Sequence, residues 1–185
     1  MGDILNKAVA FAVGAHAGQC RKGTQVPYIL HPMEAAVIVG SMTVDDEVLA
    51  AAVLHDVAED TDFTVEDIRA QFGPRVAELV AGESENKRED LPAEDTWKLR
   101  KQETLQHLEN APLDVQMIAL GDKLSNMRAI SRDYAQLGDA LWQRFNQKDK
   151  AQHGWYYGGI ARCLAALQGS AAYAEYTALV QQVFG

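Results

Sequence analysis

The chain has 185 residues, 48% of them hydrophobic, which is enough for one folded domain with a substantial core. Its formal net charge of −9 argues against broad nucleic-acid binding, because such binding needs a basic face that displaces counterions. No apolar stretch approaches the roughly 18 residues of a membrane span, and Cys20 and Cys163 match no zinc spacing. We therefore expect a soluble, cytoplasmic protein with reduced thiols.

Apolar residues recur at intervals of three and four along almost the whole chain, which is the spacing of amphipathic helices. The predicted helices cover, in chain order, 4–15, 32–42, 45–58, 65–72, 74–82, 94–110, 113–131, 139–168 with an interruption, and 170–184. Thr64 with Asp67 three residues later is typical of a helix start, and Gly73 of a helix end. Residues 83–93 are polar and predict an exposed loop. Because strand patterns, repeats and linkers are absent from the sequence, we expect a single all-α domain over residues 1–185.

The segment 52–60, AVLHDVAED, places a histidine and three carboxylates at the end of an apolar run. Buried charged groups are costly unless they are paired or bind a metal, and acids at a helix C-terminus oppose the helix dipole. Residues four apart share a helix face, so we expect His55 above Glu59. For the same reason, Asp56 is expected above Asp60. This pattern favours a functional site over an ordinary solvated helix end.

Two further polar residues lie in apolar surroundings. His31 stands at the start of the second predicted helix, where it could point into a bundle. Asp122 interrupts the apolar positions of 115–124, so we expect it to face the interior, where it needs a partner. Two imidazoles and two carboxylates from three helices suit Mn²⁺, Fe²⁺ or Mg²⁺ better than a closed zinc site. The candidate metal ligands are His31, His55, Asp56 and Asp122.

Three ordered motifs, RKGTQVPYILHP, LHDVAED and GDKLSNMR, resemble those of the HD-domain metal-dependent phosphohydrolases. More narrowly, they resemble the hydrolase domain of RelA/SpoT homologues, and the chain has the length of the stand-alone small alarmone hydrolases. The resemblance runs from about Ala8 to Leu167 and implies an HD-type bundle of about eight to ten helices. It also implies one Mn²⁺ on the four candidate ligands, with Glu59 and Asp60 assisting the attacking water. The family reaction removes the 3′-diphosphate of guanosine tetra- or pentaphosphate and releases GDP or GTP and pyrophosphate.

The resemblance further implies which residues receive the anionic substrate. They lie in the loop before His31 and in the turn after Asp122. The expected substrate-binding residues are Arg21, Lys22, Tyr28, Lys123, Asn126 and Arg128. A basic group at 98–101 resembles the segment after the VTEDK-like loop of the family, whereas AGESENKRED at 81–90 departs from that loop.

Two other functions are compatible with these motifs. An HD phosphohydrolase acting on another nucleotide, such as an adenine alarmone or NADPH, would use the same metal site. A nucleotide sensor without turnover would not need Glu59 and Asp60, whose presence counts against it. The sequence therefore predicts a Mn²⁺-dependent alarmone 3′-pyrophosphohydrolase with a small nucleotide substrate and with neither nucleic acid nor membrane as partner. It leaves the oligomeric state open.

Overall fold

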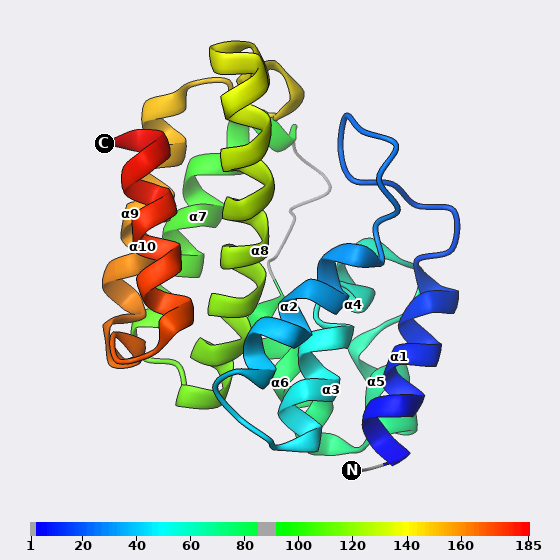
Figure 1. Ribbon diagram of the computed structural model, residues 1–185. Coiled ribbons are helices and arrows are strands. Elements are labelled where there is room, and N and C mark those ends of the chain that lie inside the picture. Colours follow the sequence, from blue (N-terminus) through cyan, green and yellow to red (C-terminus); the bar gives the residue numbers. More distant parts are fainter. Residues whose placement is uncertain (1–2, 85–91) are drawn as a thin grey trace.

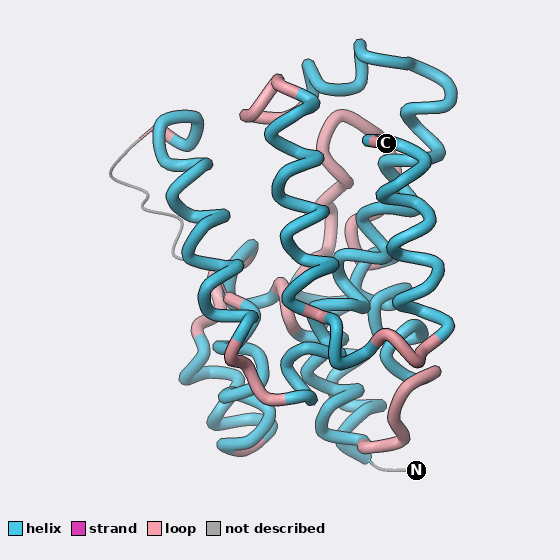
Figure 2. The backbone as a smooth tube through the Cα atoms, turned by 90° about the vertical axis from the view of Figure 1, so that its left-hand side faces the viewer, coloured by secondary structure: helices cyan, strands magenta, loops and turns pink. Residues whose placement is uncertain are grey.

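The computed structural model describes residues 3–84 and 92–185, and helices form most of that part of the chain (Figures 1 and 2). The elements are α1 (Asp3–Ala15), α2 (Leu30–Gly40), α3 (Asp46–Leu54), α4 (Val57–Asp60), α5 (Val65–Phe72), α6 (Pro74–Glu83), α7 (Ala93–Glu109), α8 (Leu113–Leu137), the 3₁₀ helix η1 (Gly138–Arg144), α9 (Lys150–Cys163), the 3₁₀ helix η2 (Ala165–Leu167) and α10 (Ala171–Phe184). Across the described ranges, extended pairing is limited to one bridge between Cys20 and Pro27. The predicted all-α fold is confirmed. None of the described helices is both long enough and apolar enough to span a bilayer.

The helix predicted over 45–58 is interrupted at the residues of greatest chemical interest. α3 ends at Leu54, and α4 begins at Val57. The Nδ1 atom of His55 donates a hydrogen bond of 2.8 Å to the carbonyl of Ala52, the acceptor that a continuing helix would offer to the amide of residue 56. The prediction of one unbroken helix was therefore wrong, because the His55 side chain competes for a backbone acceptor.

Two later boundaries also differ from the prediction. α8 continues past residue 131 to Leu137, because its apolar face extends through Ile130 and Tyr134. It ends where Gly138 adopts a φ of +54°, a conformation that favours glycine. The interrupted helix predicted over 139–168 consists of η1, α9 and η2. The predicted capping of α5 is confirmed, since Thr64 accepts from the Asp67 amide while the Asp67 side chain accepts from the Thr64 amide.

α8 runs through the middle of the molecule and separates two groups of helices (Figure 1). α2, α3 and α6 contact it on one side, and α10 contacts it on the other. One continuous apolar core spans both groups, with fully buried residues such as Leu54, Leu120 and Tyr176 contributed by α3, α8 and α10. A single core built around one central helix makes the chain one all-helical domain.

The contact between α2 and α8 is unusually close at one point, and this contact positions the site. A Cβ atom at Gly121 would lie 2.7 Å from Val39 and 2.8 Å from the carbonyl oxygen of Ala35. Glycine therefore lets the two backbones approach. The next residue of α8 is Asp122, and the first turn of α2 carries His31, so this approach brings the two predicted ligands together.

Candidate functional site

Three of the predicted ligands form a buried metal site. His31 comes from α2, His55 follows α3, and Asp122 comes from α8. Each offers one ligand atom, and these atoms all lie within 4.8 Å of one another. The three residues are 3–6% exposed. Two imidazole nitrogens and one carboxylate oxygen at this spacing have the composition of a divalent-metal site.

The fourth predicted ligand, Asp56, faces the same point. Its Oδ2 atom lies 3.4 Å from Nε2 of His31 and 3.2 Å from Nε2 of His55. Oδ1 of Asp122 approaches the same two nitrogens, at 3.1 Å from His31 and 3.8 Å from His55. The fold therefore brings together all four side chains that the sequence singled out as metal ligands.

His55 carries a specific sign that a cation fits here. Because its Nδ1 donates to the Ala52 carbonyl, the neutral imidazole carries its lone pair on Nε2. That Nε2 is fully buried and finds no hydrogen-bond partner among the described residues. A buried acceptor without a donor is costly. A divalent cation between His55 and the two aspartates would satisfy the nitrogen and neutralise the carboxylates.

The electrostatics of the cluster also favour added positive charge. Burial lowers the pKa of His55, but Asp56 and Asp122 outweigh burial and raise that pKa to about 10. Burial would raise the pKa of Asp56, but the two histidines hold it well below its usual range. The pKa of Asp122 is likewise held below its usual range, chiefly by Lys123, against the effect of burial. Such a cluster binds either protons on its histidines or a cation in their place.

The two predicted catalytic acids lie beside this metal site. Glu59 and Asp60 line the same small polar pocket as the ligands, a pocket of about 200 Å³. The hydroxyl oxygen of Tyr28 lies 2.8 Å from Oδ2 of Asp56 and 2.7 Å from Oδ2 of Asp60, so it can donate to either carboxylate. Burial and these two carboxylates raise the pKa of Tyr28 above its usual range, so Tyr28 remains a donor. Tyr28 thereby holds the predicted ligand Asp56 and the predicted catalytic acid Asp60 close to one another.

A larger cleft of about 800 Å³ adjoins the polar pocket. Five residues line both spaces, namely Arg21, Tyr28, His31, Asp60 and Asn126. The walls of the cleft include apolar side chains, among them Ile130, Leu141 and Phe145. The cleft has the volume and the mixed lining of a small-molecule site.

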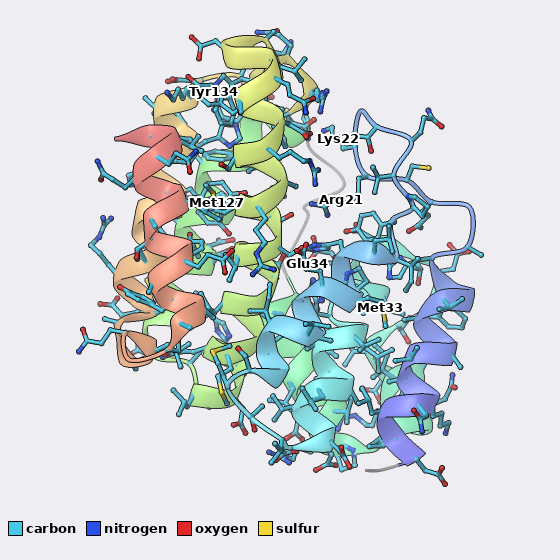
Figure 3. All side chains as sticks on the ribbon, in the orientation of Figure 1. Arg21, Lys22, Met33, Glu34, Met127 and Tyr134 are labelled. Atoms are coloured by element: carbon cyan, nitrogen blue, oxygen red, sulfur yellow. The ribbon has the colours of Figure 1, made fainter. Side chains whose placement is uncertain are left out.

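Two predicted substrate cations reach across this cleft (Figure 3). Nη2 of Arg21 donates to Oδ1 of Asn126 at 2.5 Å, and Nζ of Lys22 donates to Oδ1 of Asn146 at 2.8 Å. Both acceptors are neutral amides, so these hydrogen bonds do not neutralise the positive charges of Arg21 and Lys22. By contrast, Arg144 on the same cleft binds the carboxylate of Asp133 at 2.8 Å.

Lys123 and Asn126 both contact Asp122, one of the predicted metal ligands. Lys123 forms an ion pair with Asp122, and Nδ2 of Asn126 donates to Oδ1 of Asp122 at 2.5 Å. Burial lowers the pKa of Lys123, but Asp122 outweighs it, and the pKa lies well above its usual value. Both residues line the polar pocket, as expected of substrate contacts.

Arg128 is the predicted substrate residue that the structure places elsewhere. Its guanidinium binds Glu34 on α2 and Glu175 on α10, and Arg128 lines neither the pocket nor the cleft. Six residues turn an α-helix by about 240°, so Arg128 faces away from Asp122.

Of the basic group at 98–101, Lys101 lines the polar pocket, whereas Lys98 lies over the ring of Trp155.

Sequence reasoning missed Glu83. It was assigned to an exposed loop, but it ends α6, is half-buried and lines the polar pocket. Burial raises its pKa to about 8. A signal was present, because Glu83 follows the buried residues Leu79 and Val80 at the helical intervals of four and three. Most of the predicted loop, 85–91, lies outside the described residues.

Known proteins resemble this chain in sequence and in structure. The HD domain family model matches residues 8–150. A guanosine-3′,5′-bis(diphosphate) 3′-pyrophosphohydrolase from Vibrio cholerae is 39% identical over 134 residues, which are 69% of this chain and 18% of that protein. An enzyme of the same name from Danio rerio is 36% identical over 133 residues, which are 70% of each chain.

A solved structure of a metazoan ortholog of SpoT that hydrolyses ppGpp superposes with a TM-score of 0.75. It is 25% identical and covers 98% of this chain and 96% of its own. The chain spans less than a fifth of the length of the long bacterial relatives that it matches. With the fold, the buried His/His/Asp site and a family match over most of its length, this chain belongs to the HD-domain phosphohydrolases and resembles the small alarmone hydrolases among them.

Proposed function

We propose that residues 1–185 form a single Mn²⁺-dependent hydrolase domain that removes the 3′-diphosphate of guanosine tetra- or pentaphosphate. The products are GDP or GTP and pyrophosphate. The observation that carries this proposal is a buried metal site flanked by two carboxylates, Glu59 and Asp60, at the end of a cleft where Arg21 and Lys22 donate to neutral amides of the described residues. The names of the Vibrio and Danio relatives support the choice of substrate.

Four side chains would hold the ion, namely His31, His55, Asp56 and Asp122. Mixed imidazole and carboxylate ligands are suited to Mn²⁺. When bound, the ion lowers the pKa of a water ligand and neutralises phosphate charge. The orphaned Nε2 of His55 supports this assignment, because a ligand set without an ion leaves that atom unsatisfied.

Glu59 and Asp60 would take the proton of the attacking water. A carboxylate within reach of the water provides general-base catalysis. Tyr28 would act on this step indirectly, because its hydroxyl holds Asp60 at 2.7 Å and so restricts the orientation of that carboxylate.

The substrate is more acidic than the protein, so its attraction must be local. Arg21 and Lys22 supply charge at the cleft, and Lys123 supplies charge beside the metal ligands. Exposed charges are screened over about 8 Å at physiological salt, so the distant acidic surface has little influence within the cleft. Arg21 and Lys22 would exchange their amide acceptors for phosphate oxygens, which accept stronger charge-assisted hydrogen bonds.

A substrate panel tests this function. Metal-free protein is incubated with and without Mn²⁺, together with guanosine tetraphosphate, guanosine pentaphosphate, an adenine alarmone or NADPH, and the products are separated by nucleotide chromatography. We expect Mn²⁺-dependent release of pyrophosphate with GDP or GTP, and no turnover by Asp56→Asn. Release of single phosphates only, or turnover of NADPH or the adenine alarmone alone, would contradict the proposal. Binding of guanosine tetraphosphate without turnover would identify a sensor.

A further inference from the structure

His31 is the one candidate ligand whose far nitrogen contacts a side-chain hydroxyl in the described structure. Its Nδ1 atom lies 2.9 Å from Oγ of Ser125 on α8. The Ser125 hydroxyl donates to Oε2 of Glu34 at 2.7 Å. His31 and Ser125 are 4% and 2% exposed, so water does not readily replace the contact between them.

The direction of these hydrogen bonds follows from counting protons. A carboxylate only accepts, so the single proton of the Ser125 hydroxyl points to Glu34. The oxygen of Ser125 must then accept a proton from Nδ1 of His31. With Nδ1 protonated, the neutral imidazole carries its lone pair on Nε2, the atom that lies 3.1 Å from Asp122. These two hydrogen bonds, from His31 to Ser125 and from Ser125 to Glu34, are called the relay below. They select the tautomer of His31 that can bind a metal.

Glu34 is itself held by an ion pair with Arg128. Its second oxygen, Oε1, accepts from Nη1 of Arg128 at 3.0 Å. The other edge of the guanidinium donates twice to Glu175 on α10, at 2.6 and 2.7 Å. Two parallel hydrogen bonds fix the plane of an arginine. The chain of contacts thus runs from the ligand His31 to the C-terminal helix.

We propose that Ser125 and Glu34 are positioning residues that orient His31 for metal binding, and that Arg128, anchored on Glu175, holds Glu34 in place. The inference rests on the proposed metal site. It gives Arg128 a role in place of the substrate contact expected from the sequence. His55 needs no such relay, because its Nδ1 is held by the backbone carbonyl of Ala52.

A pair of variants at Ser125 tests the relay through Mn²⁺ affinity alone. Free Mn²⁺ is measured by electron paramagnetic resonance during titration of metal-free protein, without nucleotide. Ser125→Thr keeps the hydroxyl, whereas Ser125→Val lacks it. The Val and Thr side chains have nearly the same volume, so the difference in Mn²⁺ affinity between the two variants measures the effect of the hydrogen bonds. We expect Ser125→Val to weaken Mn²⁺ binding ~10- to 100-fold and Ser125→Thr to stay within about 3-fold of the wild type.

Glu34→Gln provides a second test at a position whose side chain is 40% exposed and tolerates substitution. An amide can donate as well as accept, so it permits the reversed relay, in which Ser125 donates to His31. We expect Glu34→Gln to weaken Mn²⁺ binding about 10-fold. Asp114→Asn is the matched control. It removes one carboxylate charge from a partly exposed cluster away from the site, in which Arg75 pairs with Asp45, Glu47 and Asp114.

Equal Mn²⁺ affinity of the Val and Thr variants would overturn the inference. So would an equal loss in Glu34→Gln and Asp114→Asn, which would indicate general destabilisation. If Ser125→Val does not fold, Glu34→Gln with its control decides the matter. A parallel assay with guanosine tetraphosphate keeps the two proposals separate. Mn²⁺ binding with the expected ranking, but no hydrolysis by the wild type, would contradict the proposed function and support the relay.

Discussion

Two clusters of charged side chains can be compared. In the Arg75 cluster, Arg75 at the start of α6 contacts the carboxylates of Asp45, Glu47 and Asp114. The His55 cluster consists of His55, His31, Asp56 and Asp122. In the Arg75 cluster, the arginine and its three partners have side chains that are 38–42% exposed, and the three acids lie 2.8–3.0 Å from the guanidinium. In the His55 cluster, both histidines and Asp122 are buried, the side chain of Asp56 is 14% exposed, and Nε2 of His55 has no hydrogen-bond partner among the described residues.

Burial separates the structural charge cluster around Arg75 from the candidate metal site around His55. Both clusters collect acidic side chains, but exposed ion pairs are solvated and contribute about 0–1 kcal/mol each. A buried cluster has no solvent to compensate it, so the nitrogen of His55 beside two carboxylates is relieved either by a proton on the histidine or by a bound cation. A buried imidazole nitrogen that faces two carboxylates is therefore better evidence of a cation site than the number of charges.

The largest effect is expected from removing a metal ligand. His55→Ala or Asp56→Asn should weaken Mn²⁺ binding more than ~100-fold and abolish hydrolysis, because each substitution removes an atom that would contact the ion. Metal content, measured by mass spectrometry beside turnover, checks this. Asp114→Asn, the same chemical change in the Arg75 cluster, should leave both quantities intact. Normal Mn²⁺ content in the His55 and Asp56 variants would mean that the ligand set is misassigned.

The two neighbouring acids should separate catalysis from metal binding. Glu59→Gln and Asp60→Asn remove a proton acceptor but no proposed ligand, so turnover should fall ~100-fold or more while Mn²⁺ content stays unchanged. Turnover numbers and metal analysis on the same preparations provide the measurement. Unchanged turnover in both variants would show that these carboxylates have only a structural role.

The cations of the cleft should affect substrate binding and leave the metal in place. Arg21→Ala and Lys22→Ala should each raise KM ~10-fold or more, because each variant loses a charge-assisted hydrogen bond to phosphate. Arg69→Ala is the matched control, since Arg69 is a partly exposed arginine that pairs with Glu66 and Glu78. Steady-state kinetics with Mn²⁺ analysis decides the outcome. A KM equal to that of the control would place the substrate on another side of the metal site.

The smallest effect is expected in the Arg75 cluster, as a pH dependence of stability. The hydrogen bond from Arg75 lowers the pKa of Asp45, so this carboxylate stabilises the fold above its unfolded pKa of about 3.9. That contribution is lost as the pH falls through the lower folded pKa. Asn caps helices as well as Asp does, so Asp45→Asn preserves the N-cap of α3 and removes only the charge.

Urea unfolding at several pH values measures this contribution. Wild type should exceed Asp45→Asn by no more than about 1 kcal/mol at pH 7. The difference should shrink as the pH falls below about 4, because Asp45 then takes up a proton in the unfolded chain before it does so in the folded protein. A difference that is constant with pH would mean that the charge of Asp45 does not contribute, and a larger one would contradict the description of this cluster as a solvated surface network.

Most helical elements and three residues of the metal site could be predicted from the sequence. Apolar spacing and end signals are local properties of the chain, so the capped start of α5 and its end at Gly73 could be read directly. His31, His55 and Asp122 could also be singled out, because a polar residue within an apolar stretch needs a compensating partner wherever the helices pack. Their approach to one another also required the close contact of α2 and α8 at Gly121.

Which neighbouring residues belong to the site could not be predicted from the sequence, because it depends on how the helices pack. Arg21 and Arg128 both stand near ligand motifs, but Arg21 reaches Asn126 across the cleft, whereas rotation along α8 directs Arg128 to Glu34 and Glu175. Glu83 joins the polar pocket because α6 ends beside α8. The direction of a side chain depends on helix rotation and on the contacts between helices, and these are set by residues far apart in the chain.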